Sequence, residues 1–175
     1  MASKIAADWY AHYLEDPGDA YTEWQQYGVA VLPLGEWADA VRLPEVLVHA
    51  FVASDTTADV NVAVAEVLEG PVIHDARGRN YYAFVPPGTA PQWHLSHLGV
   101  ECLSHGTHLG VPDISQDRPS PRRPIYWAAC PEAKRFCHMA SVGLLVRIGT
   151  ARLAEDGGSR IAARPPAAGY GQASR

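Results

Sequence analysis

Residues 71–85 have the sequence PVIHDARGRNYYAFV, and this stretch decides the fold. Two runs of apolar and aromatic residues, 71–74 and 80–85, flank the turn-forming residues 75–78. Runs rich in Val, Ile, Tyr and Phe on either side of a glycine-containing turn are typical of a β-hairpin. The Pro-Pro-Gly sequence at 86–88 ends the second strand, because proline cannot donate to a strand ladder. We therefore predict an antiparallel hairpin near the middle of the chain.

The hydrophobic patterns on both sides of the hairpin predict an α+β fold. Asp19 is the expected N-cap of the second helix, Pro44 is expected in the first turn of the third, and Gly70 is expected to end the fourth. Helices are expected at 4–15, 19–26, 45–53, 58–68 and 138–154, and further strands at 29–32, 37–42, 99–103, 107–111 and 125–128. This order predicts a mainly antiparallel sheet with helices packed on one face.

The length and composition indicate a single globular domain with flanking segments. A chain of 175 residues is about one domain long. Its 47% hydrophobic and 19% charged residues are typical of a folded protein. We expect an N-terminal helical segment at 1–26 and an α+β core at 27–154. Residues 155–175 are rich in Gly, Ala, Pro and Ser, which predicts a disordered tail.

The charge balance and the apolar pattern exclude some classes of protein. The chain has 14 basic and 19 acidic residues, a net charge of −5, which argues against a sequence-independent DNA clamp and an anionic-membrane binder. No apolar run reaches the ~18 residues of a membrane span, and the first residues contain no apolar run of signal-peptide length. We therefore expect a cytoplasmic protein without membrane association, with its three cysteines reduced.

Most motifs that carry catalysis are absent from the sequence. There is no Walker loop, no Gly-x-Gly-x-x-Gly and no Gly-x-Ser-x-Gly nucleophile elbow. No strand carries an Asp-x-Asp pair, although magnesium-dependent phosphoryl transfer requires clustered hard oxygen ligands. We therefore assign no catalytic residue.

A segment rich in histidine and cysteine leaves two interpretations open. Residues 93–108 contain His94, His97, Cys102, His105 and His108. Imidazole and thiolate are preferred zinc ligands, but this spacing matches no zinc ribbon or finger. Either a zinc-dependent enzyme or zinc-stabilised protein uses the segment 94–108, or these are scattered polar residues and the protein has no metal cofactor.

Arginines gather in two segments that flank the predicted strands. Arg77 and Arg79 lie on the hairpin turn, where they could hold an anion or simply face solvent. Arg118, Arg122 and Arg123 lie among prolines in the loop 112–124, where they could contact a nucleic-acid backbone or an acidic partner. Both interpretations stay open for each segment.

A series of short motifs points to a known family. The series comprises WADAVRLP at 37–44, YAFVPPGT at 82–89, Trp93, CL at 102–103, GTHL at 106–109, VP at 111–112 and YW at 126–127. It resembles the N-terminal domain of bifunctional DNA primase/polymerases over residues 27–130. The resemblance implies a primase-type α+β sheet and a role related to DNA replication. Active members carry paired acidic metal ligands and a histidine beside a Gly-rich turn. This chain lacks that acidic pair, and GRNYY at 78–82 has no matching histidine, so we expect a catalytically degenerate scaffold.

The first hypothesis is a non-catalytic binding or regulatory module for a nucleotide, nucleic acid or protein partner. We expect its site on the concave face of the sheet, with five candidate binding residues. Arginine pairs with phosphate or carboxylate, and tryptophan offers a stacking surface. Arg42 could instead form a salt bridge, for example with Glu45, and Trp93 could pack in the core. The candidates are Trp37, Arg42, Arg79, Trp93 and His108.

A further hypothesis is a structural subunit of a protein complex. The aromatic residues near the N-terminus could form its interface, because aromatics are enriched at protein contacts. They could equally pack on their own domain. These residues are Trp9, Tyr10, Tyr13 and Trp24. The oligomeric state is left open.

Overall fold

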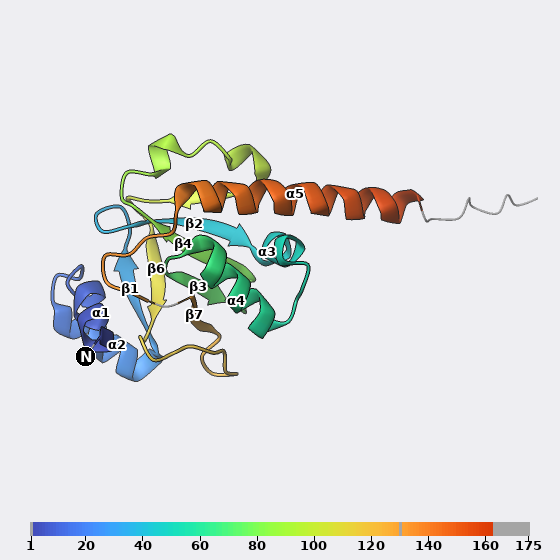
Figure 1. Ribbon diagram of the computed structural model, residues 1–175. Coiled ribbons are helices and arrows are strands. Elements are labelled where there is room, and N and C mark those ends of the chain that lie inside the picture. The colour runs from blue at the N-terminus through green and yellow to red at the C-terminus, as the bar shows by residue number, and fades with distance from the viewer. Residues whose placement is uncertain (1, 130, 163–175) are drawn as a thin grey trace, which may run out of the picture.

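The computed structural model describes residues 2–129 and 131–162 and shows an α+β fold (Figure 1). The helices are α1 (Ala2–Ala11), α2 (Pro17–Tyr27), α3 (Glu45–Val52), α4 (Thr57–Leu68) and α5 (Met139–Ala162), with 3-10 turns η1 (Ala90–Gln92) and η2 (Ser96–Leu98). The strands are β1 (Val29–Pro33), β2 (Asp39–Pro44), β3 (Val72–Asp75), β4 (Asn80–Val85), β5 (Glu101–Leu103), β6 (His108–Pro112) and β7 (Ile125–Ala129). The predicted fold class is therefore confirmed.

The central sheet is built around the predicted hairpin. Its strand order is β5-β2-β4-β3-β7, and every neighbouring pair is antiparallel. Strands β3 and β4 pair from Val72 opposite Ala83 to Asp75 opposite Asn80. The Asp75 carboxylate accepts hydrogen bonds from the backbone N–H groups of Arg77 (3.1 Å) and Gly78 (2.9 Å), which holds the connecting turn in one conformation.

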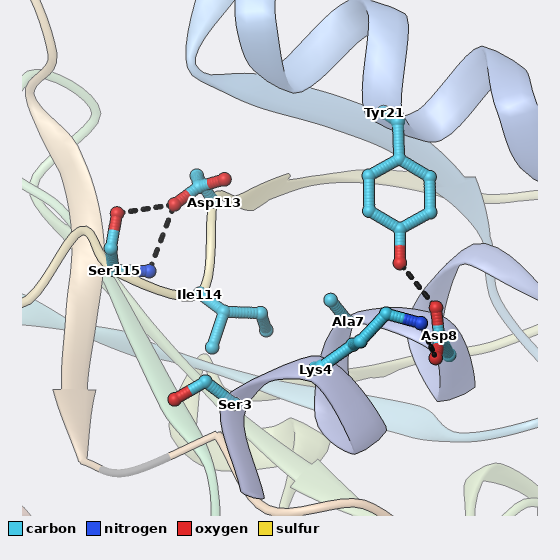
Figure 2. Close-up of a pocket in the computed structure, with 8 residues that line it drawn as sticks. All are labelled: Ser3, Lys4, Ala7, Asp8, Tyr21, Asp113, Ile114 and Ser115. Atoms are coloured by element: carbon cyan, nitrogen blue, oxygen red, sulfur yellow. Dashed lines mark hydrogen bonds and ion pairs between the residues drawn. The ribbon is translucent and has the colours of Figure 1, made fainter. Parts of the chain in front are cut away.

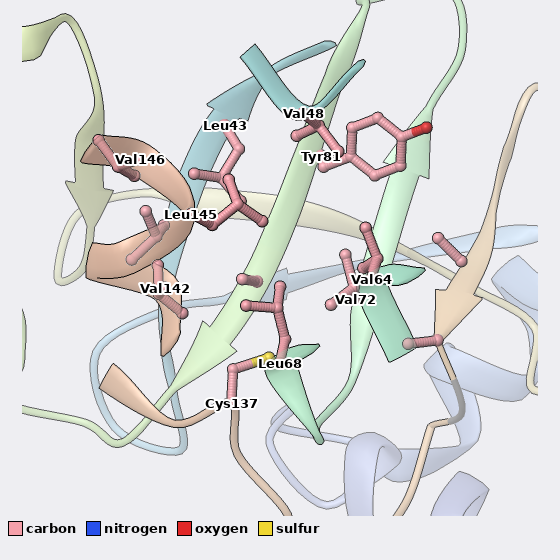
Figure 3. Packing of buried hydrophobic residues seen from close by; sticks show 14 of the residues in the cluster. Leu43, Val48, Val64, Leu68, Val72, Tyr81, Cys137, Val142, Leu145 and Val146 are labelled. Carbon is pink, nitrogen blue, oxygen red and sulfur yellow. The ribbon is translucent and has the colours of Figure 1, made fainter. Parts of the chain in front are cut away.

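Helices α3, α4 and α5 cover one face of the central sheet (Figures 1 and 3). Alternate residues of the strands point toward these helices, because successive side chains in a strand face opposite sides. Cys137, just before α5, is buried in the same cluster. The cluster also includes Leu43, Val72 and Tyr81 from the strands, and Val48, Val64, Leu68, Val142, Leu145 and Val146 from the helices.

The opposite face is covered as well, which the sequence did not predict. The remaining strand side chains, among them Ile73, Phe84 and Trp127, pack against a layer made of α1, α2 and the β1–β6 pair. Tyr10 of α1 lies within 5.3 Å of Trp127 and 6.2 Å of Phe84, measured between ring centroids. The concave face that we expected to carry the site is therefore largely core. The strands can pack against both layers because apolar residues occupy odd as well as even positions, and successive side chains point to opposite faces.

Some element boundaries differ from the predictions for local reasons. Asp16, not Asp19, caps α2, because its side chain accepts from Gly18 N at 2.8 Å and Pro17 follows it. Helix α4 ends at Leu68, as predicted, but its C-cap is Glu69 in the left-handed conformation (φ 53°) and not Gly70.

Two further findings concern strand partners and the length of the last helix. The strands predicted at 99–103 and 107–111 are present as β5 and β6, and β5 joins β2 in the central sheet while β6 joins β1 in the second sheet. Helix α5 continues to Ala162, through residues for which disorder was predicted from position 155. The rest of the predicted tail, 163–175, lies outside the described residues.

Candidate functional site

Two arginine-bearing turns meet at one end of the central sheet. Strand β7 pairs with β3, with Ile125 opposite Asp75. The contact continues beyond the strands, because Ala76 N donates to Pro124 O at 3.2 Å. The hairpin turn at 76–79 therefore lies against the end of the loop at 122–124. We call residues 76–79 and 120–123 together the arginine turns.

The second of these turns is closed by its own hydrogen bonds. Ser120 and Arg123 exchange two backbone hydrogen bonds, both 3.0 Å long, and Ser120 Oγ accepts from Arg123 N at 3.1 Å. Pro121 restricts the backbone of the turn further. Arg122 and Arg123 are exposed, as is Arg77 on the hairpin turn. Each exposed guanidinium is therefore carried by a backbone with little freedom.

Most of the charge at the arginine turns is not neutralised. Within residues 2–129 and 131–162, Arg77, Arg122 and Arg123 make no ion pair. Arg118 differs, since its Nε lies 3.0 Å from a carboxylate oxygen of Asp117.

Arg123 also explains a glycine at the end of α2. A Cβ at Gly28 would lie 2.8 Å from Arg123 Nε, and Gly28 has a φ of +77°. Its left-handed conformation and the close approach of Arg123 both favour glycine here. Arg123 lies beside the C-terminal end of α2, where the helix dipole favours a cation.

A buried polar network connects β3 and β7 to the hairpin turn through the side chain of Glu45. His74 on β3 is 5% exposed, and its Nε2 lies 3.1 Å from Glu45 Oε1 while its Nδ1 lies 2.8 Å from the hydroxyl of Tyr126. The His74 ring stacks on Tyr81, with centroids 3.9 Å apart and planes 2° apart. The other oxygen of Glu45 accepts from Arg79 Nε at 3.0 Å. Glu45 thus connects a buried histidine to an exposed arginine.

The surroundings of this network determine its protonation. Burial lowers the pKa of His74, and the neighbouring Glu45 offsets this only in part, so the imidazole is neutral at pH 7. Burial alone would raise the pKa of Glu45, but the hydrogen bonds from Arg79 and His74 outweigh it and hold the pKa below its ordinary value. Burial raises the pKa of Tyr126 to about 12, so its hydroxyl stays protonated. With both His74 and Tyr126 buried, the network acts as a support for Arg79 and its turn.

The five predicted binding residues do not form one site. Trp37 is 2% exposed and packs among Trp9, Tyr10, Tyr13 and Phe84. Its indole N–H donates to the carbonyl of Pro33. Trp37 therefore belongs to the core and has no surface to offer a ligand, which corrects the prediction.

Arg42, Trp93 and His108 lie apart from one another. Arg42 Nη2 lies 2.8 Å from a carboxylate oxygen of Glu101 on β5, so the salt bridge that we considered exists, with a partner other than Glu45. Trp93 is half-buried and donates from Nε1 to Val100 O at 2.8 Å. His108 is exposed on β6. Of the five predicted residues, only Arg79 lies on the arginine turns.

The histidine- and cysteine-rich segment does not converge on a metal site. Its residues are spread over the η1–η2 connection, β5, the following turn and β6. Over the described ranges, the structure contains no group of three or more His, Cys, Asp or Glu side chains placed to hold a metal ion. Burial raises the pKa of Cys102 to about 12, so its thiol is protonated at neutral pH. The zinc hypothesis for residues 94–108 gains no support.

A hollow of about 450 Å³ lies between α1, α2 and residues 113–115 (Figure 2). Four of its polar side chains, those of Lys4, Asp8, Tyr21 and Asp113, have partners within its own wall. Tyr21 donates to Asp8 at 2.5 Å, Lys4 Nζ lies 3.4 Å from Asp8, and Asp113 accepts from Ser115 N at 2.9 Å. The contact between Tyr21 and Asp8 joins α2 to α1, and the other two contacts lie within α1 and within the loop at 113–115.

The N-terminal aromatics pack mainly inward. Tyr10 is 0% exposed and Trp24 is 3% exposed, and both belong to the core layer over the central sheet. Trp9 and Tyr13 are partly buried against the same layer. Tyr10 and Trp24 are therefore too buried to contribute to the aromatic interface that we considered for this segment.

Sequence reasoning missed Glu45, His74 and Tyr126. They are far apart in the chain, and each lies within an ordinary apolar pattern. Only a polar residue in a predicted strand, His74, signals that a buried partner must exist.

Comparison of the chain with models of protein families, with curated proteins and with solved structures found no match. Separately, none of the helices in the described part of the chain is both long enough and apolar enough to span a membrane.

Proposed function

We propose that this protein is a non-catalytic binding module that holds a phosphate-bearing ligand, a nucleotide or nucleic acid, on its arginine turns. One observation carries the proposal. The Ala76–Pro124 hydrogen bond joins two fixed turns whose three exposed guanidinium groups, on Arg77, Arg122 and Arg123, have no ion-pair partner among the residues the structure describes. The resemblance to primase–polymerase domains supports the same ligand class and a regulatory role in DNA replication.

The chemistry of guanidinium fits this ligand. Its planar donors match the oxygens of a phosphate group, and it remains charged at every physiological pH. Several arginines on rigid turns lose little freedom on binding, which favours affinity. The net charge of −5 does not oppose this locally, because charges farther away than about 8 Å are largely screened at physiological salt. The free thiols of Cys102 and Cys137 favour a reducing compartment such as the cytoplasm as the place of action.

Fluorescence anisotropy with labelled single- and double-stranded DNA, and competition by a mononucleotide, tests this proposal. Binding should weaken steeply with salt, because each phosphate contact releases counterions and contributes about −0.9 to the log–log slope on duplex DNA. Arg77→Gln and Arg122→Gln should each weaken binding about ten-fold, or by about 1.4 kcal/mol, and make the slope shallower.

Arg118→Gln is the matched control for these variants. Arg118 lies on the same loop, but Asp117 already neutralises it, so its loss should leave affinity and slope nearly unchanged. Equal effects of all three variants would argue for diffuse charge attraction instead of a site. Absence of binding at low salt to every probe, or binding that ignores salt, would refute the proposal.

A further inference from the structure

A second surface of the protein is an open groove beside α5, which we call the α5 groove. It has a volume of about 410 Å³ and runs between the N-terminal part of α5 and the loop that carries η1 and η2. Met139, Gly143, Leu144 and Arg147 line it from α5, and Trp93 and Leu95 line it from the loop. The groove shares no residue with the arginine turns.

The groove combines an apolar wall with one unpaired cation. Leu144 is 52% exposed and adds apolar surface to the wall of the groove. Arg147 is exposed and makes no ion pair with any described residue. Among the described residues, no Asp or Glu lines the groove. Its charge is therefore uncompensated, and its complement is an anion attached to an apolar body.

Gly143 keeps the groove open although packing does not demand a glycine. A Cβ at Gly143 would lie 3.8 Å from Leu95 Cδ1, which is ordinary van der Waals contact. The position is helical, where glycine costs about 1 kcal/mol relative to alanine. By contrast, a Cβ at Gly149 on the same helix would lie 2.6 Å from Leu47 O, so packing does require that glycine. The absent side chain of Gly143 deepens the groove instead.

The dimensions of the groove select a small ligand. Met139 and Arg147 are separated by eight helical steps, which is about 12 Å along the axis. The volume lies within the range of about 300–1,000 Å³ that is usual for small-molecule sites. One arginine can bind one carboxylate through two parallel hydrogen bonds. We propose that the α5 groove binds a medium-chain carboxylate, with the acyl chain along Leu95, Gly143 and Leu144 and the carboxylate on Arg147.

Octanoate is the probe that tests this proposal. Titration into the full chain, followed by calorimetry and saturation-transfer NMR, should show one saturable site. Octylammonium should bind at least about ten-fold more weakly, because its charge is opposite in sign. Arg147→Gln should weaken octanoate binding about ten-fold, as expected for the loss of a charged hydrogen-bonding partner.

A second pair of variants tests the path of the acyl chain. Gly143→Met should fill the groove and abolish octanoate binding. Gly157→Met is its matched control, because Gly157 lies on the same helix with no atom within 4 Å of its missing Cβ, and it should bind like the unaltered protein. If Gly143→Met fails to fold, Arg147→Gln at an exposed position decides the question alone.

Three results would overturn the proposal. They are no saturable binding of octanoate, equal binding of octanoate and octylammonium, and unaltered binding by both folded Arg147→Gln and Gly143→Met. Binding to anionic vesicles or to an acidic peptide without binding of octanoate would also overturn it, since the occupant would then be a macromolecular surface.

Discussion

Glu45 contacts both the buried His74 and Arg79 on the hairpin turn, and no other described side chain makes a hydrogen bond to both. Replacement of Glu45 by alanine removes both contacts. The Glu45 side chain is 15% exposed and the His74 side chain 7% exposed, so their contact at 3.1 Å is shielded from water. Loss of a hydrogen bond to a charged, buried partner costs about 1.5–3 kcal/mol. The contact with Arg79 adds little, about 0–1 kcal/mol, because the Arg79 side chain is 69% exposed. We expect Glu45→Ala to lower the free energy of unfolding by about 2–3 kcal/mol.

Urea denaturation at pH 7.5 measures this loss, and a thermal melt should show a decrease of roughly 4–12 °C for a chain of this size. Glu45→Gln retains one carbonyl acceptor and should lose less. Glu66→Ala is the surface control, since Glu66 is an exposed α4 residue, and it should change stability by less than about 0.5 kcal/mol. If Glu45→Ala behaves like Glu66→Ala, the network does not support the turn and the reasoning fails.

The same network predicts a dependence of stability on pH. The pKa of His74 is lowered on folding, so the folded state binds fewer protons than the unfolded state below the ordinary value of 6.5. Stability is therefore full above pH 6.5 and declines as the pH falls below it. The pKa of Glu45 is also lowered, so its contribution is full above 4.5 and disappears as the pH falls through its folded value. Glu45→Ala should remove the second decline, whereas a flat profile of the unaltered protein between pH 7.5 and 5 would contradict the first.

Two further predictions concern packing and thiol chemistry. Gly149→Ala should destabilise the protein by about 1–3 kcal/mol in urea denaturation, because the new Cβ would overlap Leu47 O and separate α3 from α5. Gly157→Ala, the control on the same helix, should stabilise the protein by about 0.5–1 kcal/mol. Equal effects of the two substitutions would show that α3 and α5 do not approach closely. Burial raises the pKa of both Cys102 and Cys137 to about 12, so neither thiol is ionised at pH 7.5. Peptide mass spectrometry should therefore find both cysteines unlabelled by iodoacetamide until denaturant is added. Rapid labelling of Cys137 in the native protein would disprove its burial.

The elements that sequence patterns located are those with local causes. The hairpin of β3 and β4 follows from β-branched and aromatic runs around Asp75 and Gly78, and the hydrogen bonds of the Asp75 side chain within its turn span two and three residues. The three helices over one face follow from apolar residues at helical spacing. The strands after the hairpin were found, but their partners were not, because β5 and β6 are close in sequence and belong to different sheets.

Sequence patterns located the two turns of the candidate site but not their contact with each other. The arginines of both turns were noticed, since Gly and Pro mark turns directly. Their meeting depends on the pairing of β3 with β7, which joins residues about fifty positions apart and has no local signal. Trp37 was predicted to bind because a tryptophan ring offers a stacking surface. The structure buries it, since Trp9 and Tyr10 of α1, together with Tyr13 just after that helix, place aromatic rings against it.

The arrangement of layers agrees with a proposed phosphate site on the arginine turns rather than on a face of the sheet. With α3, α4 and α5 on one face and α1, α2 and the β1–β6 pair on the other, the centre of the sheet is covered on both faces, and Ile73 and Phe84 are buried on the second face. On the face toward α1 and α2, side chains become more exposed near the hairpin turn. Arg42 and Tyr82, which lie opposite each other on β2 and β4, are only partly buried there. The proposed phosphate site therefore uses the turn end of the sheet rather than one of its faces. Its cations are carried there by turns fixed through Asp75 and Ser120, which places charge at the surface without opening the core.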